Sequence, residues 1–264
     1  MSKKEQTALE KYYGKFNEDH RLTTRHGQVE FSTSMKHIHS FIKEGEKIKI
    51  LDIGAGTGRY SIALAREGHI VTAVEPVKKN LDILLSRHEN VNCWPGDARN
   101  MCFLEDETFD ITLMFGPMYH LHGEEERVKA LKEACRVTKK GGLIFIAYIM
   151  NEYSLISYVF GKNKIKEVES KNLLDKDTFH LKDCDNELYT YLRLEDIENT
   201  NKKAGGVERI KIFAPDGPAD YMRQSLNAMD EDDFNRFLDF QFSVSERPDL
   251  LGASSHTVDV LRRL

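Results

Sequence analysis

Between residues 48 and 149, short apolar runs follow one another along the chain at regular intervals. Amphipathic segments, whose apolar residues recur at helical spacing, separate the runs. Crossovers of this length force neighbouring strands into parallel pairing, because a tight hairpin cannot join two parallel strands. The alternation predicts a doubly wound α/β fold, with strands at residues 48–53, 70–75, 91–94, 109–115 and 143–149.

Two later segments add to this sheet. Residues 207–213 and 256–262 have strand character, which makes the expected sheet seven-stranded and mostly parallel. In the last segment polar residues alternate with valines as far as Val260, but Leu261 then falls on the polar face and interrupts the alternation. Before it, Asp230 is expected to cap a helix whose first turn is acidic, where the helix dipole favours negative charge.

The expected organisation is one domain over residues 1–264. Apolar residues at positions 31, 35, 38 and 42 predict a helix over residues 28–43, ahead of the sheet, and a shorter helix is expected before it, around residues 4–13. After residue 149 the rhythm is lost in a polar stretch with scattered aromatic residues. The interpretation assigns residues 1–45 to a helical lid, 46–150 to the ligand-binding core, 151–205 to an inserted cap and 206–264 to the completion of the sheet.

Charge and cysteine content exclude several classes of protein. With 38 Lys and Arg against 43 Asp and Glu, the formal charge is -5, so no strong overall field attracts nucleic acid or an anionic membrane. The four cysteines match neither a zinc nor a redox spacing, which favours reduced thiols. No export signal or long apolar stretch is present. We therefore expect a cytoplasmic protein without a membrane span.

The most informative motif is a glycine-rich turn after the first strand. Its glycines stand at positions 54, 56 and 58, where they allow a tight turn and close approach of a ligand to the main chain. Asp52 precedes the turn, and Glu75 ends the next strand, where a carboxylate usually holds ribose hydroxyls. Dinucleotide-binding proteins favour GxGxxG, but Arg59 stands where the third glycine would be. A carboxylate aimed at the turn suits a cationic ligand better than a pyrophosphate.

These residues resemble motif I of the Rossmann-like, or class I, S-adenosylmethionine-dependent methyltransferases. Further similarities to that family follow in order at Glu75, at residues 96–98, at residues 109–121 and at residues 137–142, so the resemblance covers residues 48–149. Residues 18–22, 26–31 and 116–121 also resemble a broad bacterial subgroup of small-molecule methyltransferases. The resemblance implies S-adenosylmethionine as the cofactor.

The resemblance also implies which residues bind each part of that cofactor. Asp52 and the turn are expected to hold the amino acid portion, Glu75 the ribose, and Asp97 with Ala98 the adenine. Phe115 and Gly116 are expected to line the channel between the sulfur and the acceptor. The expected cofactor-binding residues are Asp52, Gly54, Ala55, Gly56, Gly58, Glu75, Pro76, Asp97, Ala98, Phe115 and Gly116.

The residues facing the acceptor are less constrained by the sequence. Tyr119 and His120 follow the fourth strand, so His120 is a candidate proton acceptor and Tyr119 either a catalytic group or a wall of the pocket. Arg223 and His256 are candidates for holding an acidic group of the substrate. The candidates for a lid over the cofactor are Tyr12, Tyr13, Arg21, His26 and Glu30, of which the tyrosines and Arg21 have structural alternatives.

The sequence therefore predicts a methyltransferase that acts on a small molecule. Transfer from a sulfonium is an in-line displacement, which requires positioning and exclusion of water but no metal ion. Three alternatives stay open: a methyltransferase that modifies tRNA or another nucleic acid, a nicotinamide oxidoreductase, and a cofactor-binding module without catalysis. The acceptor, the methylated atom and the oligomeric state are not determined.

Overall fold

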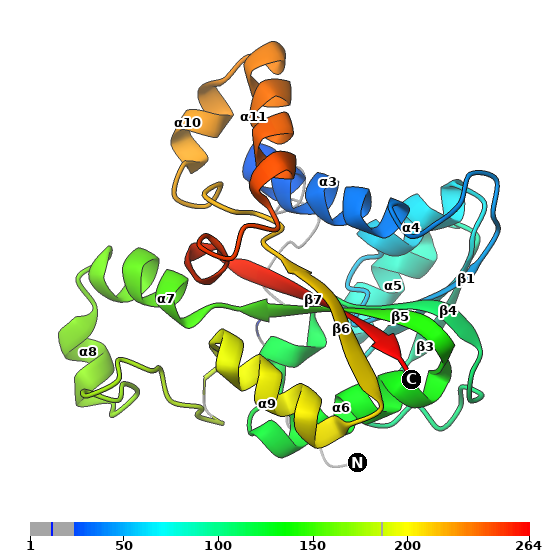
Figure 1. The fold of residues 1–264 in the computed structure, drawn as a ribbon, viewed down its shortest axis with the longest axis horizontal. Coiled ribbons are helices and arrows are strands. Elements are labelled where there is room, and N and C mark those ends of the chain that lie inside the picture. The colour runs from blue at the N-terminus through cyan, green and yellow to red at the C-terminus, as the bar shows by residue number, and fades with distance from the viewer. Residues whose placement is uncertain (1–11, 13–23, 186) are drawn as a thin grey trace.

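A computed structural model describes residue 12 and residues 24–185 and 187–264 of the chain. Seven strands form one sheet in the order β3-β2-β1-β4-β5-β7-β6 (Figure 1). Six of the strands run in the same direction, and β7 runs antiparallel to them. This confirms the predicted seven-stranded, mostly parallel sheet. The strands are β1 (Lys49–Ile53), β2 (Ile70–Glu75), β3 (Val91–Pro95), β4 (Phe109–Met114), β5 (Thr138–Ile149), β6 (Val207–Phe213) and β7 (His256–Arg263).

Helices cover both faces of the sheet, because alternate residues of each strand point to opposite faces. Ile50 packs with the face covered by α3 and α4, whereas Leu51 packs with the face covered by α6 and α9 (Figure 1). The helices are α3 (Arg25–His39), α4 (Arg59–Arg66), α5 (Lys78–Ser86), α6 (Glu124–Val137), α7 (Asn151–Ser154), α8 (Ile165–Ser170), α9 (Leu194–Ala204), α10 (Arg223–Ala228) and α11 (Glu231–Val244). Short turns of helix are η1 (Pro117–His120), η2 (Leu155–Phe160) and η3 (Leu251–Ala253).

The helix predicted over residues 28–43 is α3, displaced toward the N-terminus. Thr24 caps it, because its side chain accepts a hydrogen bond from the Gly27 N–H at 3.4 Å. The helix ends at His39. A shorter helix expected around residues 4–13 lies almost entirely outside the described residues.

Two strands differ from the sequence pattern. Residues 138–142, ahead of the strand expected at residues 143–149, are instead the first part of β5, where a register shift against β4 and the positive φ of 77° at Gly141 accommodate an irregularity. Leu261 was expected on the polar face of β7 but is fully buried. Val258 and Val260 pack in the core cluster on one face of the sheet and Leu261 in the cluster on the other, so both faces of β7 are covered and the alternation fails.

The segment expected to form a cap, residues 151–205, contains two differently packed parts. Its first part, with α7, η2 and α8, buries a small cluster of its own around Leu155, Val159 and Val168. Its last part, α9, packs beside α6, and Ile197 joins the main core. The portion outside the helical layers therefore ends before Leu194.

The two helices that follow β6, α10 and α11, pack on α3 near the N-terminal end of the chain. Val29, Leu226 and Phe234 are buried together there (Figure 1). The expected cap of α11 is confirmed, because the Asp230 carboxylate accepts the Asp233 N–H at 2.9 Å. This packing fixes α3, and with it Glu30, beside the edge of the sheet where the strands end.

Candidate active site

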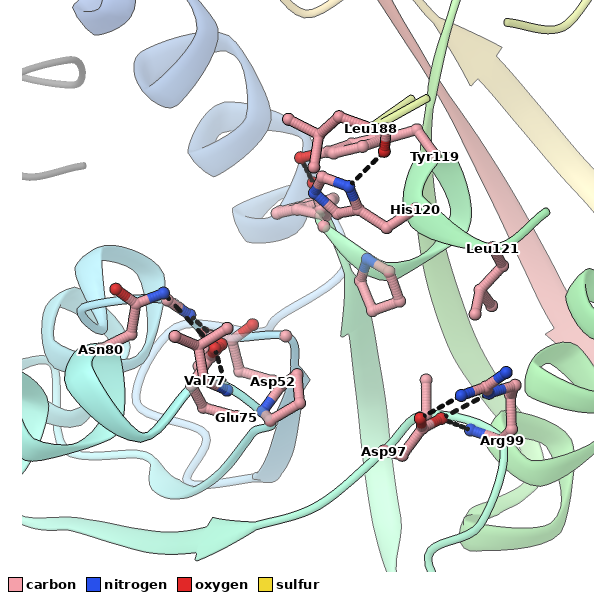
Figure 2. A pocket seen from close by; sticks show the side chains of 18 of the residues that line it. Asp52, Glu75, Val77, Asn80, Asp97, Arg99, Tyr119, His120, Leu121 and Leu188 are labelled. Atoms are coloured by element: carbon pink, nitrogen blue, oxygen red, sulfur yellow. Dashed lines mark hydrogen bonds and ion pairs between the residues drawn. The ribbon is translucent and has the colours of Figure 1, made fainter. Parts of the chain in front are cut away.

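The carboxyl ends of β1, β2 and β4 border a cavity of about 570 Å³. Parallel strands end at the same edge of a sheet, so residues far apart in the chain meet there. Figure 2 shows Glu75 with Asn80 on one side, Asp97 with Arg99 on another, and Tyr119 with His120 across the cavity. A cavity of this volume accommodates a cofactor or a drug-sized ligand.

The glycine-rich turn forms the floor between β1 and α4. Gly54 has a φ of 71°, and its N–H donates to the Val74 carbonyl at 2.7 Å, which anchors the turn to β2. A Cβ atom at Gly54 would lie 2.8 Å from Cδ of Pro117, so no larger residue fits without a shift. Gly58 caps α4 in the left-handed region, with a φ of 89°. The glycines thus keep backbone at the cavity surface.

Asp52 is buried in the wall of the cavity. Its carboxylate accepts a hydrogen bond from the Ser61 hydroxyl at 2.5 Å. Burial raises the pKa of Asp52 to about 6, and the hydrogen bonds from Ser61 oppose that rise. A buried carboxylate with this pKa favours a positively charged ligand, because a nearby cation stabilises its ionised form.

Glu75 joins the glycine-rich turn to the start of α5. One of its oxygens accepts the Gly56 N–H at 2.8 Å, and the other accepts the Val77 N–H at 2.9 Å. The Asn80 amide lies 3.4 Å from the second oxygen. Burial raises the pKa of Glu75, although these hydrogen bonds favour the carboxylate. The side chain is therefore held in place at the cavity wall.

Asp97 is paired with Arg99 on the opposite side. The two side chains make two hydrogen bonds of 2.9 and 2.5 Å, and Arg99 also contacts Glu126 at 2.7 Å. The hydrogen bonds from Arg99 are the main reason that the pKa of Asp97 lies below its usual value. The carboxylate is therefore ionised at neutral pH. Ala98, beside it, is buried and also lines the cavity.

Tyr119 and His120 line the same cavity as Phe115 and Gly116. The Tyr119 hydroxyl donates to the Phe115 carbonyl at 2.8 Å. Nδ1 of His120 lies 3.0 Å from the Leu188 carbonyl, which accepts only, so Nδ1 carries the proton. Burial lowers the pKa of His120 to about 4, which makes the ring neutral near pH 7.

Two of the five lid candidates are placed near this cavity. Glu30, on α3, lines it. The Tyr12 ring lies 6.1 Å from the Tyr189 ring, which in turn lies 5.2 Å from the ring of His120. His26 lies at the start of α3, 3.4 Å from the Thr24 hydroxyl, and does not line the cavity. Tyr13 and Arg21 lie outside the described residues.

The two candidates for holding an acidic group are placed differently. His256 is the first residue of β7, and its ring lies 5.9 Å from the Tyr119 ring. Its Nδ1 lies 2.7 Å from the Asp216 carboxylate. Arg223 is exposed on α10, is paired with Asp220 and does not line the cavity. The structure therefore does not bring Arg223 and His256 together around an anion.

Several lining residues were not expected from the sequence. Most of them lie one to five positions after a motif residue. They could have been predicted from the sequence by including the whole turn that follows each strand. The residues near 185–188 come from the inserted segment, and no local pattern indicates them. The additional lining residues are Thr57, Arg59, Tyr60, Val77, Asn80, Arg99, Pro117, Leu121, His122, Glu126, Asp185, Glu187 and Leu188. Of the expected cofactor residues, Gly58 shapes the turn but does not line the cavity.

The residues present fit S-adenosylmethionine. The strand order, the glycine-rich turn after β1 and the carboxylate that ends β2 together define the fold and cavity of class I methyltransferases. The buried Asp52 suits the positive charges of the ligand, Glu75 places a second carboxylate at the cavity wall, and the glycine backbone leaves room for close contact.

Comparisons with known proteins agree with this class. Residues 51–146 match the family described as a methyltransferase domain. The cypemycin N-terminal methyltransferase of a Streptomyces species is 37% identical over 100 residues, covering 37% of this chain and 40% of that protein. A ubiquinone biosynthesis O-methyltransferase of Rhizobium etli is 34% identical over 108 residues, covering 39% and 42%. The chain thus spans about two fifths of the length of these curated relatives.

A solved structure shows the fold over nearly the whole chain. It is a protein of Thermotoga maritima described as an S-adenosylmethionine-dependent methyltransferase and possible histamine N-methyltransferase, with a TM-score of 0.60 and 20% identity, covering 96% of this chain and 98% of that one. Residues 51–146 therefore match a methyltransferase domain, and the chain as a whole shares its fold with that solved structure. No helix among the described residues is long and apolar enough to span a membrane.

Proposed function

We propose that this protein is an enzyme that transfers a methyl group from S-adenosylmethionine to a small molecule. The observation that carries the proposal is the cavity at the ends of β1, β2 and β4, where the glycine-rich turn, Glu75 and Asp97 surround a space of about 570 Å³. The same cavity continues past Phe115 to Tyr119 and His120, which leaves room for an acceptor beside the donor.

Each part of the cofactor has a partner in this proposal. Asp52 holds the amino acid portion together with the backbone of the turn, and Glu75 with Pro76 holds the ribose. Asp97 and Ala98 border the adenine. The amino acid portion is bound by the backbone at Gly54, Ala55 and Gly56, while Gly58 sets the direction of α4.

In the proposed reaction the main task of the protein is to position the cofactor and the acceptor. The cofactor supplies a methyl group on a sulfonium, which is activated for in-line displacement without a metal ion. Phe115 and Gly116 align the two reactants, and the aromatic ring of Tyr119 excludes water. His120 is neutral at pH 7, and with a pKa of about 4 it is a weak base that suits a hydrogen-bonding wall.

The names of the curated relatives support a small acceptor but differ in its identity. They refer to cypemycin, demethylmenaquinone and ubiquinone biosynthesis. The shared region is the cofactor-binding half, whereas the inserted segment and the C-terminal strands lie outside the matched residues 51–146. We infer a cytoplasmic enzyme, which the four unpaired cysteine thiols support. A methyltransferase acting on nucleic acid is the alternative.

Calorimetry with S-adenosylhomocysteine tests the cofactor assignment. We expect the wild-type protein to bind it and not to bind NAD(H). Glu75→Ala should weaken binding by about 1–3 kcal/mol, roughly 5- to 150-fold, because charged hydrogen bonds are removed. Glu75→Gln, which keeps the volume, should lose less.

The matched control is Glu67→Ala, which removes an exposed carboxylate just after α4. This variant should bind S-adenosylhomocysteine as tightly as the wild type. Melting temperatures of all variants separate misfolding from lost contacts. Unchanged affinity in a folded Glu75→Ala protein would contradict the ribose assignment. Tight NAD(H) binding would contradict the proposed function as a whole.

A further inference from the structure

Glu30, Asp216 and His256 form a cluster beside the cavity, and of the three Glu30 lines the cavity wall. They come from α3, from the segment after β6 and from the start of β7. Because β7 is antiparallel, it begins at the edge where β5 and β6 end, and His256 pairs with Ile149. One side-chain oxygen or nitrogen of each member lies within 4.8 Å of those of the other two.

Asp216 orients the imidazole ring of His256. Asp216 is 4% exposed, and one of its carboxylate oxygens lies 2.7 Å from Nδ1 of His256. The other oxygen accepts hydrogen bonds from the Ser254 hydroxyl at 2.5 Å and from the His256 N–H at 3.0 Å. An ionised carboxylate only accepts hydrogen bonds, so the proton of a neutral ring sits on Nδ1 and Nε2 carries the lone pair.

Tyr119 connects this cluster to the channel near the cofactor. Its hydroxyl donates to Phe115, whereas its ring lies 5.9 Å from the ring of His256. Glu30 and Gly54 line the same cavity. A ligand group in the cavity beside Glu30 would therefore lie next to the cluster.

The surroundings of the cluster are acidic and aromatic. A third carboxylate, Asp220, is close enough to interact electrostatically with His256. The rings of Tyr119 and Tyr189 lie 6.0 Å apart, and Tyr12 lies 6.1 Å from Tyr189. Aromatic faces and carboxylates together favour an organic cation over an anion. This differs from the sequence-based interpretation of His256 as a partner of an acidic substrate group.

We propose that the acceptor is an amine, that Glu30 recognises its ammonium form, and that His256 accepts its proton. An ammonium ion has no lone pair, so it cannot attack before it loses a proton. The proton passes to Nε2 of His256, the freed lone pair forms a bond to the methyl carbon, and the carbon–sulfur bond breaks with its electrons remaining on sulfur. The product is the methylated ammonium ion and a neutral thioether, and His256 returns its proton to water.

A divalent cation fits the cluster less well than an ammonium group. Both oxygens of Asp216 already accept hydrogen bonds, from three donor groups in all. With Asp216 occupied, the cluster offers fewer than the three protein ligands that catalytic zinc sites usually have. An ammonium group needs only hydrogen-bond acceptors and aromatic faces.

Paired probes test this inference, which rests on the proposed function. The protein saturated with S-adenosylhomocysteine is titrated with 2-phenylethylamine and 2-phenylethanol, and then with tyramine and tyrosol. Within each pair the shapes match and only the amine is cationic near pH 7. We expect each amine to bind at least about tenfold more tightly than its alcohol. With tritiated S-adenosylmethionine, the label should appear on the amines.

Variants assign the effect to the cluster. Glu30→Gln should weaken amine binding at least about tenfold and leave binding of S-adenosylhomocysteine within about twofold. His256→Asn should lower the rate of methyl transfer to the amines. Asp216→Asn should act in the same direction, because it removes the carboxylate that orients His256. Glu231→Gln, on the exposed face of α11, is the matched control and should behave like the wild type.

Several outcomes would overturn the inference while leaving the proposed function in place. They are equal binding of amines and alcohols, no binding of any amine to the S-adenosylhomocysteine complex, and amine binding that Glu30→Gln does not change. Activity lost with EDTA and restored by a divalent cation would assign the cluster to a metal and would also overturn it. Failure to bind S-adenosylhomocysteine would instead contradict the proposed function, and this inference with it.

Discussion

At the residue scale, Asp52 shows how the fold prepares a charge for its ligand. Strand β1 carries this side chain into the interior, where little water solvates the carboxylate, and Ser61 provides a hydrogen bond. Without a ligand, burial is the larger effect and raises the pKa to about 6. A cationic group next to it would favour the carboxylate again, so binding and ionisation are coupled.

This coupling predicts how stability depends on pH in the ligand-free protein. The folded state binds the Asp52 proton more tightly than the unfolded chain, because the pKa rises from 3.8 to about 6 on folding. The free energy of unfolding should therefore fall as the pH rises from about 4 to above 6, with Asp52 contributing about 2–3 kcal/mol. Urea denaturation of the wild type and Asp52→Asn measures the difference in slope. If the free energy of unfolding depended on pH in the same way in both proteins, the prediction would be contradicted.

His120 offers a second prediction at this scale. We expect His120→Ala to lower kcat/KM for the acceptor while leaving the affinity for S-adenosylhomocysteine intact, because the ring lines the part of the cavity proposed to hold the acceptor. With a pKa of about 4, His120 should contribute no titration to the rate between about pH 6 and pH 8. Pre-steady-state and steady-state rates over this range provide the measurement, with the exposed His39→Ala as the control. Unchanged turnover would leave His120 without a role in the reaction.

At the element scale, patterns of apolar residues predict which segments form helices and strands. Polar capping residues determine where a helix begins, and the position of a strand in the sheet determines which of its faces are buried. The acidic first turn of α11 is a local signal, and the structure confirms it through the bond between Asp230 and the Asp233 N–H. Strand β7 is the opposite case. Asp259 is fully buried there and pairs with Arg209 of β6, although its alternation with valines suggested a solvated face.

The cap of α11 predicts a local loss of stability. Asp230→Ala should lower the free energy of unfolding by about 1 kcal/mol, because the Asp233 N–H loses its partner. Asp232→Ala removes a carboxylate from the same turn without removing the capping bond and should cost less. Urea denaturation compares the two variants. An equal loss in both would show that charge, and not the cap, accounts for the effect.

At the scale of the whole molecule, the charge distinguishes the two proposed acceptor classes. The chain has a formal charge of -5, and carboxylates outnumber cationic groups around the cavity. Phosphate backbones are bound mainly by basic surfaces, and their affinity falls steeply with salt.

We therefore expect bulk tRNA to bind more weakly than about 10 µM at 150 mM salt, and to receive no label from tritiated S-adenosylmethionine. Fluorescence anisotropy over a series of salt concentrations measures the binding. The free cofactor product, bound in the same buffer, shows that the protein is folded. Micromolar binding that falls linearly with the logarithm of salt, together with labelled tRNA, would favour the nucleic-acid alternative.

The sequence by itself determined the sheet and the cofactor end of the cavity. The five core strands, the glycines of the turn and the carboxylate after β2 are local signals, because each depends on residues close together in the chain. Glu75 could be placed from its distance to Gly54, and the turn from the strand before it. These features needed no knowledge of distant contacts.

The cluster proposed to bind the acceptor was decided by the tertiary structure. Glu30, Asp216 and His256 lie far apart in the chain, and only the antiparallel insertion of β7 between β5 and β6 brings His256 to the edge where β6 delivers Asp216. The burial of Leu261 has the same origin. These positions depend on pairing between strands that are distant in the chain. The sequence around each residue does not indicate which distant segment will cover it.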